Sequence, residues 1–179
     1  KDELKLYTHE FELMFERRKY ILSEKEELLL AKASDVFDGS SETFSVLNNA
    51  DLKFKPIETE SGEVYPLSHG RYGLYLESKD RSIREKAFKN VYASYRDLKN
   101  TFASTLSNTV KLHNLNADVR GFSSARAAAL FANHIPESVY DALVEAINQR
   151  LNLLHKYVDL RKQSLKLDEV RMYDLYVPM

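Results

Sequence analysis

Apolar side chains recur every three or four positions along most of this chain, which is the spacing of one face of an α-helix. This pattern predicts a first helix within residues 1–20, and a second that starts at the capping-box sequence Ser23–Glu26 and runs to about Phe37. The polar stretch at 38–41 predicts a break, followed by a short third helix that ends near Asn49. Residues 1–50 are therefore expected to hold the amino-terminal helices.

Between residues 51 and 67 the period changes from helical to alternating. Leu52–Ile57 alternates apolar and polar side chains as a half-buried strand does, and Val64–Leu67 can return as its partner after the turn residues Thr59–Glu63. Pro56 and Pro66 indicate an edge or irregular pair, because proline has no N–H to donate to a ladder. The sequence predicts a small β-hairpin here.

The remainder, residues 68–179, returns to helical spacing. Ser68 is expected to cap a short helix, Asp80 a long one near 81–113, and Ser123 a short alanine-rich one before a second long helix near 137–166. Two long helices joined in this way are expected to pack antiparallel, with the apolar stripe along one helix in contact with the apolar stripe along the other. The predicted fold class is mainly α, a helical bundle with two long antiparallel helices and a small β-hairpin, and residues 1–179 are read as a single segment.

Composition narrows the function classes. The 26 Lys and Arg residues balance 27 Asp and Glu, and the net charge of -1 gives no general attraction to nucleic acid or an anionic membrane. The absence of cysteine excludes a disulfide framework and any thiolate metal site. The apolar runs are far shorter than the roughly 20 residues of a membrane-spanning helix, so we expect a soluble protein.

The five histidines were candidates for a zinc site, since a zinc-peptidase helix carries His-Glu-x-x-His. That motif is absent, because His9-Glu10 is followed by Leu13 where the second ligand would stand. His155 has Asp159 one turn later, a spacing typical of a surface ion pair.

Two other histidines have simple structural interpretations. His134 and Glu137 straddle Pro136 and are expected at a helix start, and His113 lies on an apolar stripe as a partly buried imidazole. No catalytic or metal-binding residue is therefore predicted in the segment, and its substrate-binding residues stay unknown.

A phosphate or nucleophile site is not indicated either. The stretch Ser68–Gly73 could hold an anion at a helix N-terminus, but a capped helix start explains it more simply. No Gly-x-Ser-x-Gly elbow occurs, and the eleven tyrosines lie at core spacing rather than among basic residues. The residue pattern alone indicates a helical domain without a detectable active site.

Three stretches of the sequence are distinctive when read together: residues 67–72 with 77–88, residues 117–125, and residues 135–140 with 172–178. The most specific element is the Tyr-Asp-Leu-Tyr-Val-Pro sequence at 173–178. In sequence, order and spacing these stretches resemble the amino-terminal half of the oligoendopeptidase F family, of the thimet-oligopeptidase-like clan.

The resemblance implies an amino-terminal part of a zinc metalloendopeptidase that hydrolyses short peptides in the cytoplasm. In that family the zinc-binding helix and its third, Glu ligand lie carboxy-terminal to the region matched here. The segment would then form part of the substrate-channel wall and be inactive alone. Its partners would be an oligopeptide and the absent catalytic half, with no nucleic acid and no membrane, and zinc would bind outside it.

The ends of the chain support the expectation of a fragment. The chain begins at Lys1, and its last residues, 172–179, form an apolar and aromatic stretch that would normally be buried. We therefore expect an exposed apolar surface, or self-association through it, that includes the tail side chains Tyr173, Leu175, Tyr176 and Val177. The alternative from a different class is a non-enzymatic helical module that binds a partner helix or peptide in an apolar groove.

Overall fold

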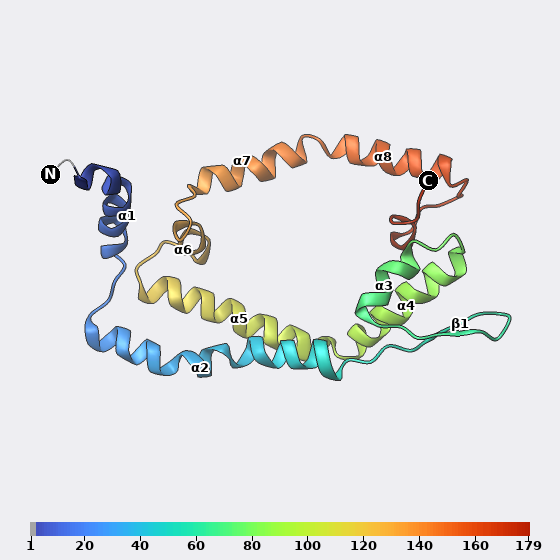
Figure 1. Ribbon diagram of the computed structural model, residues 1–179, viewed down its shortest axis with the longest axis horizontal. Helices are drawn as coiled ribbons and strands as arrows, with labels where there is room; N and C mark the ends of the chain where they lie inside the picture. The colour runs from blue at the N-terminus through green and yellow to red at the C-terminus, as the bar shows by residue number, and fades with distance from the viewer. Residues whose placement is uncertain (1–2) are drawn as a thin grey trace. The chain divides into compact units, whose positions relative to one another are not determined.

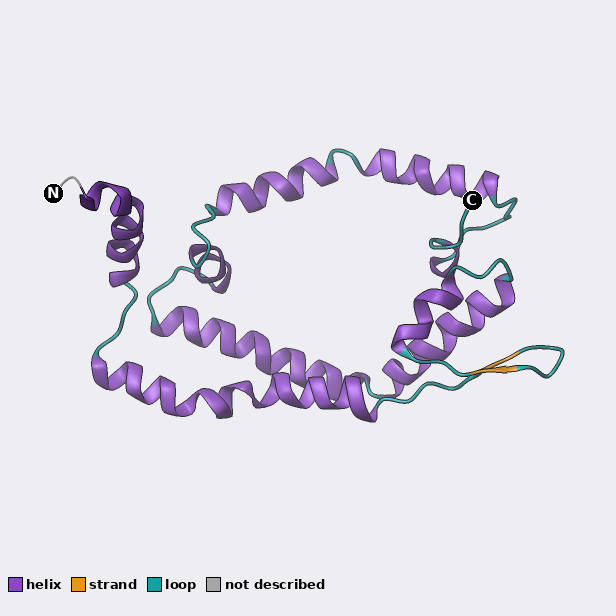
Figure 2. Ribbon diagram, in the orientation of Figure 1, coloured by secondary structure: helices purple, strands orange, loops and turns teal. Residues whose placement is uncertain are grey.

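The computed structural model describes residues 3–179, which are mostly helical (Figures 1 and 2). The expected mainly-α class with one small antiparallel hairpin is confirmed. The chain divides into two compact units: unit 1 comprises the residues up to 44 together with 104–140, and unit 2 comprises 45–103 with 141–179. No helix within residues 3–179 combines the length and the apolarity needed to cross a bilayer.

The elements follow the predicted order along the chain. The α-helices are α1 Thr8–Arg18, α2 Glu24–Val46, α3 His69–Leu76, α4 Arg81–Asp97, α5 Lys99–Val119, α6 Ala125–Phe131, α7 Glu137–Asn148 and α8 Leu151–Ser164. The strands are β1 Ile57–Glu58 and β2 Val64–Tyr65, and the short irregular helices are η1 Glu3–Tyr7, η2 Leu47–Asp51 and η3 Met172–Asp174.

Helix α2 is longer than predicted, because the expected break at residues 38–41 does not occur. A glycine such as Gly39 costs a helix interior only about 1 kcal/mol relative to alanine, which neighbouring turns can absorb. The Thr43 hydroxyl also donates to the carbonyl oxygen of Gly39 at 2.7 Å and so stays within the helix. The predicted third helix is therefore the last part of α2, which continues into η2.

The helix starts show which capping signals were correct. Ser68 accepts from the Arg71 amide, and Asp80 accepts from the Ser82 amide at 2.8 Å, both as predicted. The alanine-rich helix is capped by Ser124 rather than Ser123, a shift of one residue. At α2 one half of the capping box forms: the Ser23 amide donates to the Glu26 carboxylate, but the Ser23 hydroxyl does so too instead of accepting an amide.

Each predicted long helix is divided in two. Between α4 and α5, Leu98 has φ -106° and ψ 14°, and before α8, Arg150 has φ -114° and ψ 9°. Both residues lie in the bridge region, which ordinary side chains can adopt without a glycine or proline to mark it. The first predicted helix, near 81–113, also runs further than expected, to Val119.

The hairpin is confirmed, with a shorter ladder than the alternation suggested. Ile57 pairs with Tyr65 and Glu58 with Val64. The preceding extended residues, 53–56, contact α4 instead of a strand, since the prolines remove ladder donors.

Three polar side chains spaced one turn apart on α4 hold the extended segment at residues 53–58. Lys86 donates to the Glu58 carbonyl at 2.7 Å, and Ser94 donates to the Lys53 carbonyl at 2.8 Å. Between them, the Asn90 amide donates to the carbonyls of residues 55 and 56, at 3.2 and 2.9 Å. The helix therefore fixes the hairpin along one edge.

The core of unit 2 lies where the hairpin, α3, α4 and the chain's last residues meet, and its largest fully buried apolar side chain is Ile57. Its buried apolar side chains are Leu52, Ile57, Leu76, Ala87, Val91, Tyr173 and Val177. In unit 1 an aromatic cluster takes this role: Tyr20 stacks on Phe122 with ring centroids 3.7 Å apart, and Phe131 meets both rings at an angle.

The tail prediction was wrong for two of its four side chains. Tyr173 and Val177 are buried, with 9% and 3% of their surface exposed, while Leu175 is half-buried and Tyr176 is exposed. The apolar stripe of α7 and α8 behaves differently, since none of its apolar side chains is buried. The expected burial of this stripe against a second long helix is therefore not seen within unit 2.

Candidate functional site

The predicted histidines do not converge on one site. His9 on α1 and His155 on α8 are exposed, and His113 on α5 is exposed rather than partly buried as predicted. His134 precedes α7 and lies 3.4 Å from Glu16, whereas Glu137 pairs with Arg126 at 2.7 Å. No three His, Asp or Glu side chains within the described residues are arranged to bind a metal ion.

The stretch Ser68–Gly73 is a capped helix start, as the simpler interpretation predicted. His69 does not face an open loop, because its Nε2 lies 2.9 Å from the hydroxyl of Tyr95. That hydroxyl donates to the Asn48 side chain at 2.7 Å, so His69 donates in turn from Nε2. Burial raises the pKa of Tyr95, and the network joins α3, α4 and η2.

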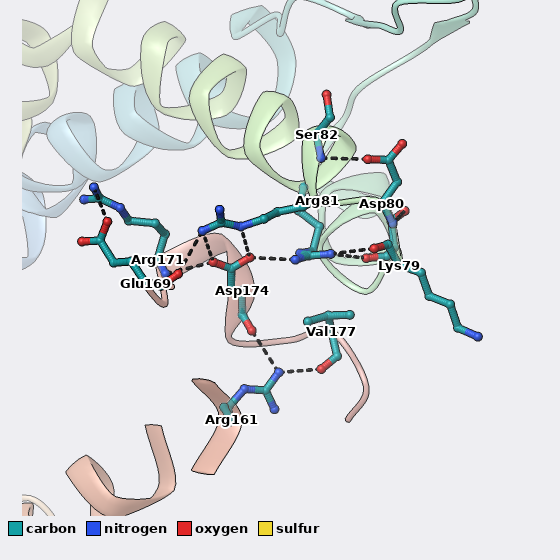
Figure 3. Close-up of polar contacts among 11 residues, drawn as sticks. Lys79, Asp80, Arg81, Ser82, Arg161, Glu169, Arg171, Asp174 and Val177 are labelled. Atoms are coloured by element: carbon teal, nitrogen blue, oxygen red, sulfur yellow. Dashed lines mark hydrogen bonds and ion pairs between the residues drawn. The ribbon is translucent and has the colours of Figure 1, made fainter. Parts of the chain in front are cut away.

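A network of hydrogen bonds and ion pairs in unit 2 surrounds Asp174, whose surface is completely buried (Figure 3). Its carboxylate accepts from Arg81 at 3.2 and 3.0 Å, from Arg84 at 2.7 Å and from the Arg171 amide at 2.9 Å. Burial alone would raise the pKa of Asp174, but the hydrogen bonds from Arg81, Arg84 and the Arg171 backbone outweigh it and lower this pKa. Asp174 is therefore a carboxylate at neutral pH.

A third arginine holds the backbone around the same residue. Arg161 of α8 donates to the carbonyls of Asp174, at 2.9 Å, and Val177. Arg84 uses its other nitrogen to bind the carbonyls of Ser78 and Lys79 at 2.8 and 3.1 Å. We call Arg81, Arg84, Arg161 and Asp174 the Asp174 cluster; it joins α4, α8, η3 and the α3–α4 connection.

Unit 1 contains a smaller pair of the same type. Arg120, at the end of α5, binds the Glu27 carboxylate with two hydrogen bonds of 2.7 and 3.0 Å and also donates to the Tyr20 carbonyl at 3.1 Å. The Leu22 amide donates to Glu27 as well. The hydrogen bonds from Arg120 and then from Leu22 lower the pKa of Glu27 to about 2. This pair fastens the α1–α2 connection to α5.

Two apolar grooves flank this pair in unit 1. One has a volume of about 460 Å³ and lies between α2 and α5, where Leu30, Phe37 and Leu112 line it. The other, of about 480 Å³, is lined by the aromatic cluster and the alanines of α6. Apolar walls with few polar groups are the usual composition of a binding groove.

The sequence did give a signal for the Asp174 cluster, although the residue pattern alone did not identify it. Asp174 interrupts an apolar stretch that must fold inward, and a buried carboxylate requires cationic partners. Arg81 and Arg84, three positions apart, were suitable partners on one helix face. The role of Arg161 could not be predicted, because Arg161 reaches the carbonyls of Asp174 and Val177 only where the chain beyond α8 folds back towards that helix.

Comparison with known proteins now decides the family. The model of peptidase family M3 matches residues 74–178, and the model of oligopeptidase F matches residues 1–54. The chain belongs to peptidase family M3. The resemblance to oligoendopeptidase F that the sequence indicated is confirmed.

The relatives of this M3 chain agree in sequence and in structure. It is 54% identical to oligopeptidase PepF of Bacillus subtilis over 179 residues, and 48% identical to an oligoendopeptidase F homolog of Lactococcus lactis over 177. The solved structure of oligoendopeptidase-F from Enterococcus faecium superposes with a TM-score of 0.92, at 53% identity over 99% of this chain. A putative peptidase from Chlamydophila abortus gives 0.93 at 29% identity over 98% of this chain.

This M3 chain spans only part of each relative. It covers 27% of the Bacillus protein, 30% of the Lactococcus protein, 35% of the Enterococcus structure and 29% of the Chlamydophila structure.

Proposed function

We propose that this chain is the amino-terminal part of a zinc-dependent oligoendopeptidase that hydrolyses short peptides in the cytoplasm. The observation that carries the proposal is the pair of family matches, to oligopeptidase F over 1–54 and to peptidase family M3 over 74–178. Relatives named as oligoendopeptidase F match 99% of the chain. Its substrate would be an oligopeptide and its main partner the catalytic half of the same enzyme.

Zinc does not fit the residues of this segment. The sequence has no His-Glu-x-x-His, and the described side chains contain no group of three ligands. In a zinc peptidase the metal polarises the scissile carbonyl, and that chemistry would come from outside these residues. The part we propose for the segment is to bind and orient peptide as one wall of the substrate channel.

The grooves of unit 1 support a wall of this kind. Both are predominantly apolar, and each is also lined by polar side chains, such as His113 and Asn116, that could bind a peptide backbone. Apolar walls of this kind can contact peptide side chains of many shapes, so they would not select one peptide sequence.

A hybrid enzyme tests the proposal. The matching 179 residues of the Bacillus relative are replaced by this chain, which is 54% identical to them, and hydrolysis of a fluorogenic oligopeptide is measured. We expect the hybrid to bind zinc and to hydrolyse the peptide, and the isolated chain to do neither. Tight one-to-one zinc in the isolated chain, or a folded hybrid that binds zinc without activity, would contradict the proposal.

The groove between α2 and α5 also favours a second candidate, a non-enzymatic module that binds a partner helix or peptide. The coding sequence distinguishes the two. A reading frame that continues past Met179 into His-Glu-x-x-His supports the peptidase, and a stop codon at that point supports the module. The isolated chain would in either case be prone to self-association through its exposed apolar stripe.

A further inference from the structure

We call residues 171–177 the strap. The hydrogen bonds that join the strap to α4 and α8 are those of the Asp174 cluster. The internal structure of the strap is one short turn, in which the Asp174 amide donates to the Arg171 carbonyl at 2.8 Å and the Leu175 amide to the Met172 carbonyl at 3.5 Å. Such a segment has too little hydrogen bonding of its own to stay ordered without attachment.

The apolar attachment of the strap is small. Tyr173 packs edge to face against Phe88 of α4, with ring centroids 5.9 Å apart, and Val177 is buried. Met172 and Tyr176 instead expose 63% and 65% of their surface. Two buried apolar side chains and the half-buried Leu175 are therefore matched against the ordering of seven residues, which is an unfavourable balance without a further contribution.

The further contribution comes from charge. Among the described residues, Asp174 is the one carboxylate that pairs with Arg81 or Arg84. Arg84 and Arg161 are 3% and 4% exposed, and the Nε atoms of both have no hydrogen-bond partner in the described chain. Without the Asp174 charge, Arg84 would be a buried cation with only carbonyls as partners, a strongly unfavourable arrangement.

We propose that the charge of Asp174 holds the strap in place. When this carboxylate is removed, the strap detaches from α3, α4 and α8 as a separate unit. Helices α3 and α4 contact each other and carry the buried apolar side chains Leu76, Ala87 and Val91, so we expect them to stay packed when the strap opens. Asp174 therefore fixes the position of the strap against α4 and α8, and it does so through one residue.

Hydrogen exchange measured by mass spectrometry on the whole 179-residue chain tests this inference. Asp174→Asn keeps the shape of the side chain and removes its charge. We expect amide exchange across residues 171–177 to become at least about tenfold faster, because charge-assisted hydrogen bonds are lost, while exchange in α3 and α4 accelerates less and both helices stay protected. Asp159→Asn on α8, an exposed carboxylate, is the matched control and should change neither region.

A milder variant keeps the test decisive if Asp174→Asn does not fold. Arg81 is 42% exposed and supplies only part of the cluster, so Arg81→Gln should accelerate exchange in the strap less than Asp174→Asn and leave α3 and α4 protected. Equal acceleration of the strap, α3 and α4 in either folded variant would overturn the inference, since the strap would then not be a separate unit. Unchanged exchange in the strap would overturn it as well.

Discussion

A carboxylate can be stable away from water if cations and amide hydrogens replace the water that it loses. Asp174 obtains two guanidinium groups and one amide in a fully buried position, and Glu27 obtains one guanidinium and one amide at a partly exposed position. The chemistry of the two sites is the same, but their burial differs. The pKa of the partly exposed Glu27 should therefore be measurable by direct titration. The ionisation of the buried Asp174 should instead be seen in how the free energy of unfolding changes with pH.

The Glu27 carboxyl should titrate near pH 2 in the folded chain. Its folded pKa lies below the ordinary value of 4.5, so the pair's contribution to stability is fully present above about pH 4.5 and is lost as the pH falls towards 2. Carbon-detected NMR of the side-chain carboxyl measures the midpoint. In Arg120→Met the midpoint should rise towards 4.5, and a midpoint that stays near 2 in this variant would show that Arg120 is not the cause.

Acid should remove the contribution of Asp174 to the stability of unit 2. Because its folded pKa is lowered, that contribution is present above the ordinary value of 3.8 and is lost as the pH falls through the folded value. At neutral pH, Asp174→Asn should cost about 3–5 kcal/mol, the usual cost of breaking a buried ion pair.

The stability difference between the wild type and Asp174→Asn should narrow below about pH 4. Denaturant unfolding followed by circular dichroism at several pH values measures it. Using the difference removes most of the background from the charged groups nearby, such as Glu85, which titrate in both proteins. A difference in the free energy of unfolding between the two proteins that stays constant with pH would contradict the prediction. The groups around Asp174 are Arg81, Arg84 and Glu85 of α4, Arg161 of α8 and Arg171 of the preceding loop. Tyr173 and the carbonyl of Glu169 lie next to Arg81.

At the scale of elements, ends that depend on local chemistry were predictable and single-residue breaks were not. Ser68 and Asp80 cap their helices as their side chains require. The breaks at Leu98 and Arg150 each involve one ordinary residue in the bridge region, so the three- and four-residue spacing of apolar positions continues across them. The periodicity of apolar residues identifies the apolar face of a helix. It does not reveal a break of one residue, because the apolar spacing is the same on both sides of the break.

The end of α5 depends on a glycine. Gly121 has φ +75°, and the Phe122 amide donates to the Ala117 carbonyl at 2.8 Å, as in a Schellman motif. Gly121→Ala should destabilise the chain by about 1–2 kcal/mol, because a Cβ is strained in the left-handed region even though the space around it is open.

The matched control for this prediction is Gly73→Ala, inside α3, where the space is also open but φ is not positive. This change should be neutral or stabilise by about 0.5–1 kcal/mol, since alanine favours a helix interior. Thermal unfolding of both variants measures the two effects. Equal effects at the two positions would show that conformation at Gly121 is not what ends the helix.

At the scale of the whole molecule, the resemblance predicted the family while the pattern of residues predicted only the class. The sequence has no His-Glu-x-x-His, and the described residues 3–179 hold no group of three metal ligands that could have identified a peptidase. The stretches that carried the resemblance do have physical roles, since 77–88 supplies Arg81 and Arg84 to Asp174 in 172–178, and 117–125 supplies Arg120 to Glu27. Those contacts join positions about ninety residues apart, which no local spacing rule detects.

The exposed stripe of α7 and α8 should make the isolated chain associate as its concentration rises. Leu143, Ile147 and Leu154 expose 60%, 57% and 55% of their surface, and burial of apolar area stabilises by about 25 cal/mol per Å². Light scattering across a dilution series should show a mass that falls towards 20.7 kDa.

Ile147→Glu and Leu154→Glu should each lower that mass at a fixed concentration, whereas Leu74→Glu on α3, which is 66% exposed, should not. A wild-type chain that stays at 20.7 kDa at every concentration would contradict this prediction.

Extended backbone with unpaired carbonyls can recruit a strand from another molecule, which is a common start of fibrous aggregation. The carbonyls of residues 53, 55, 56 and 58 already accept hydrogen bonds from Lys86, Asn90 and Ser94 of α4. Side chains of a helix thus protect this edge of the hairpin as a neighbouring strand would in a larger sheet. Any association of the chain should accordingly proceed through helix faces and yield reversible oligomers that do not bind amyloid dyes.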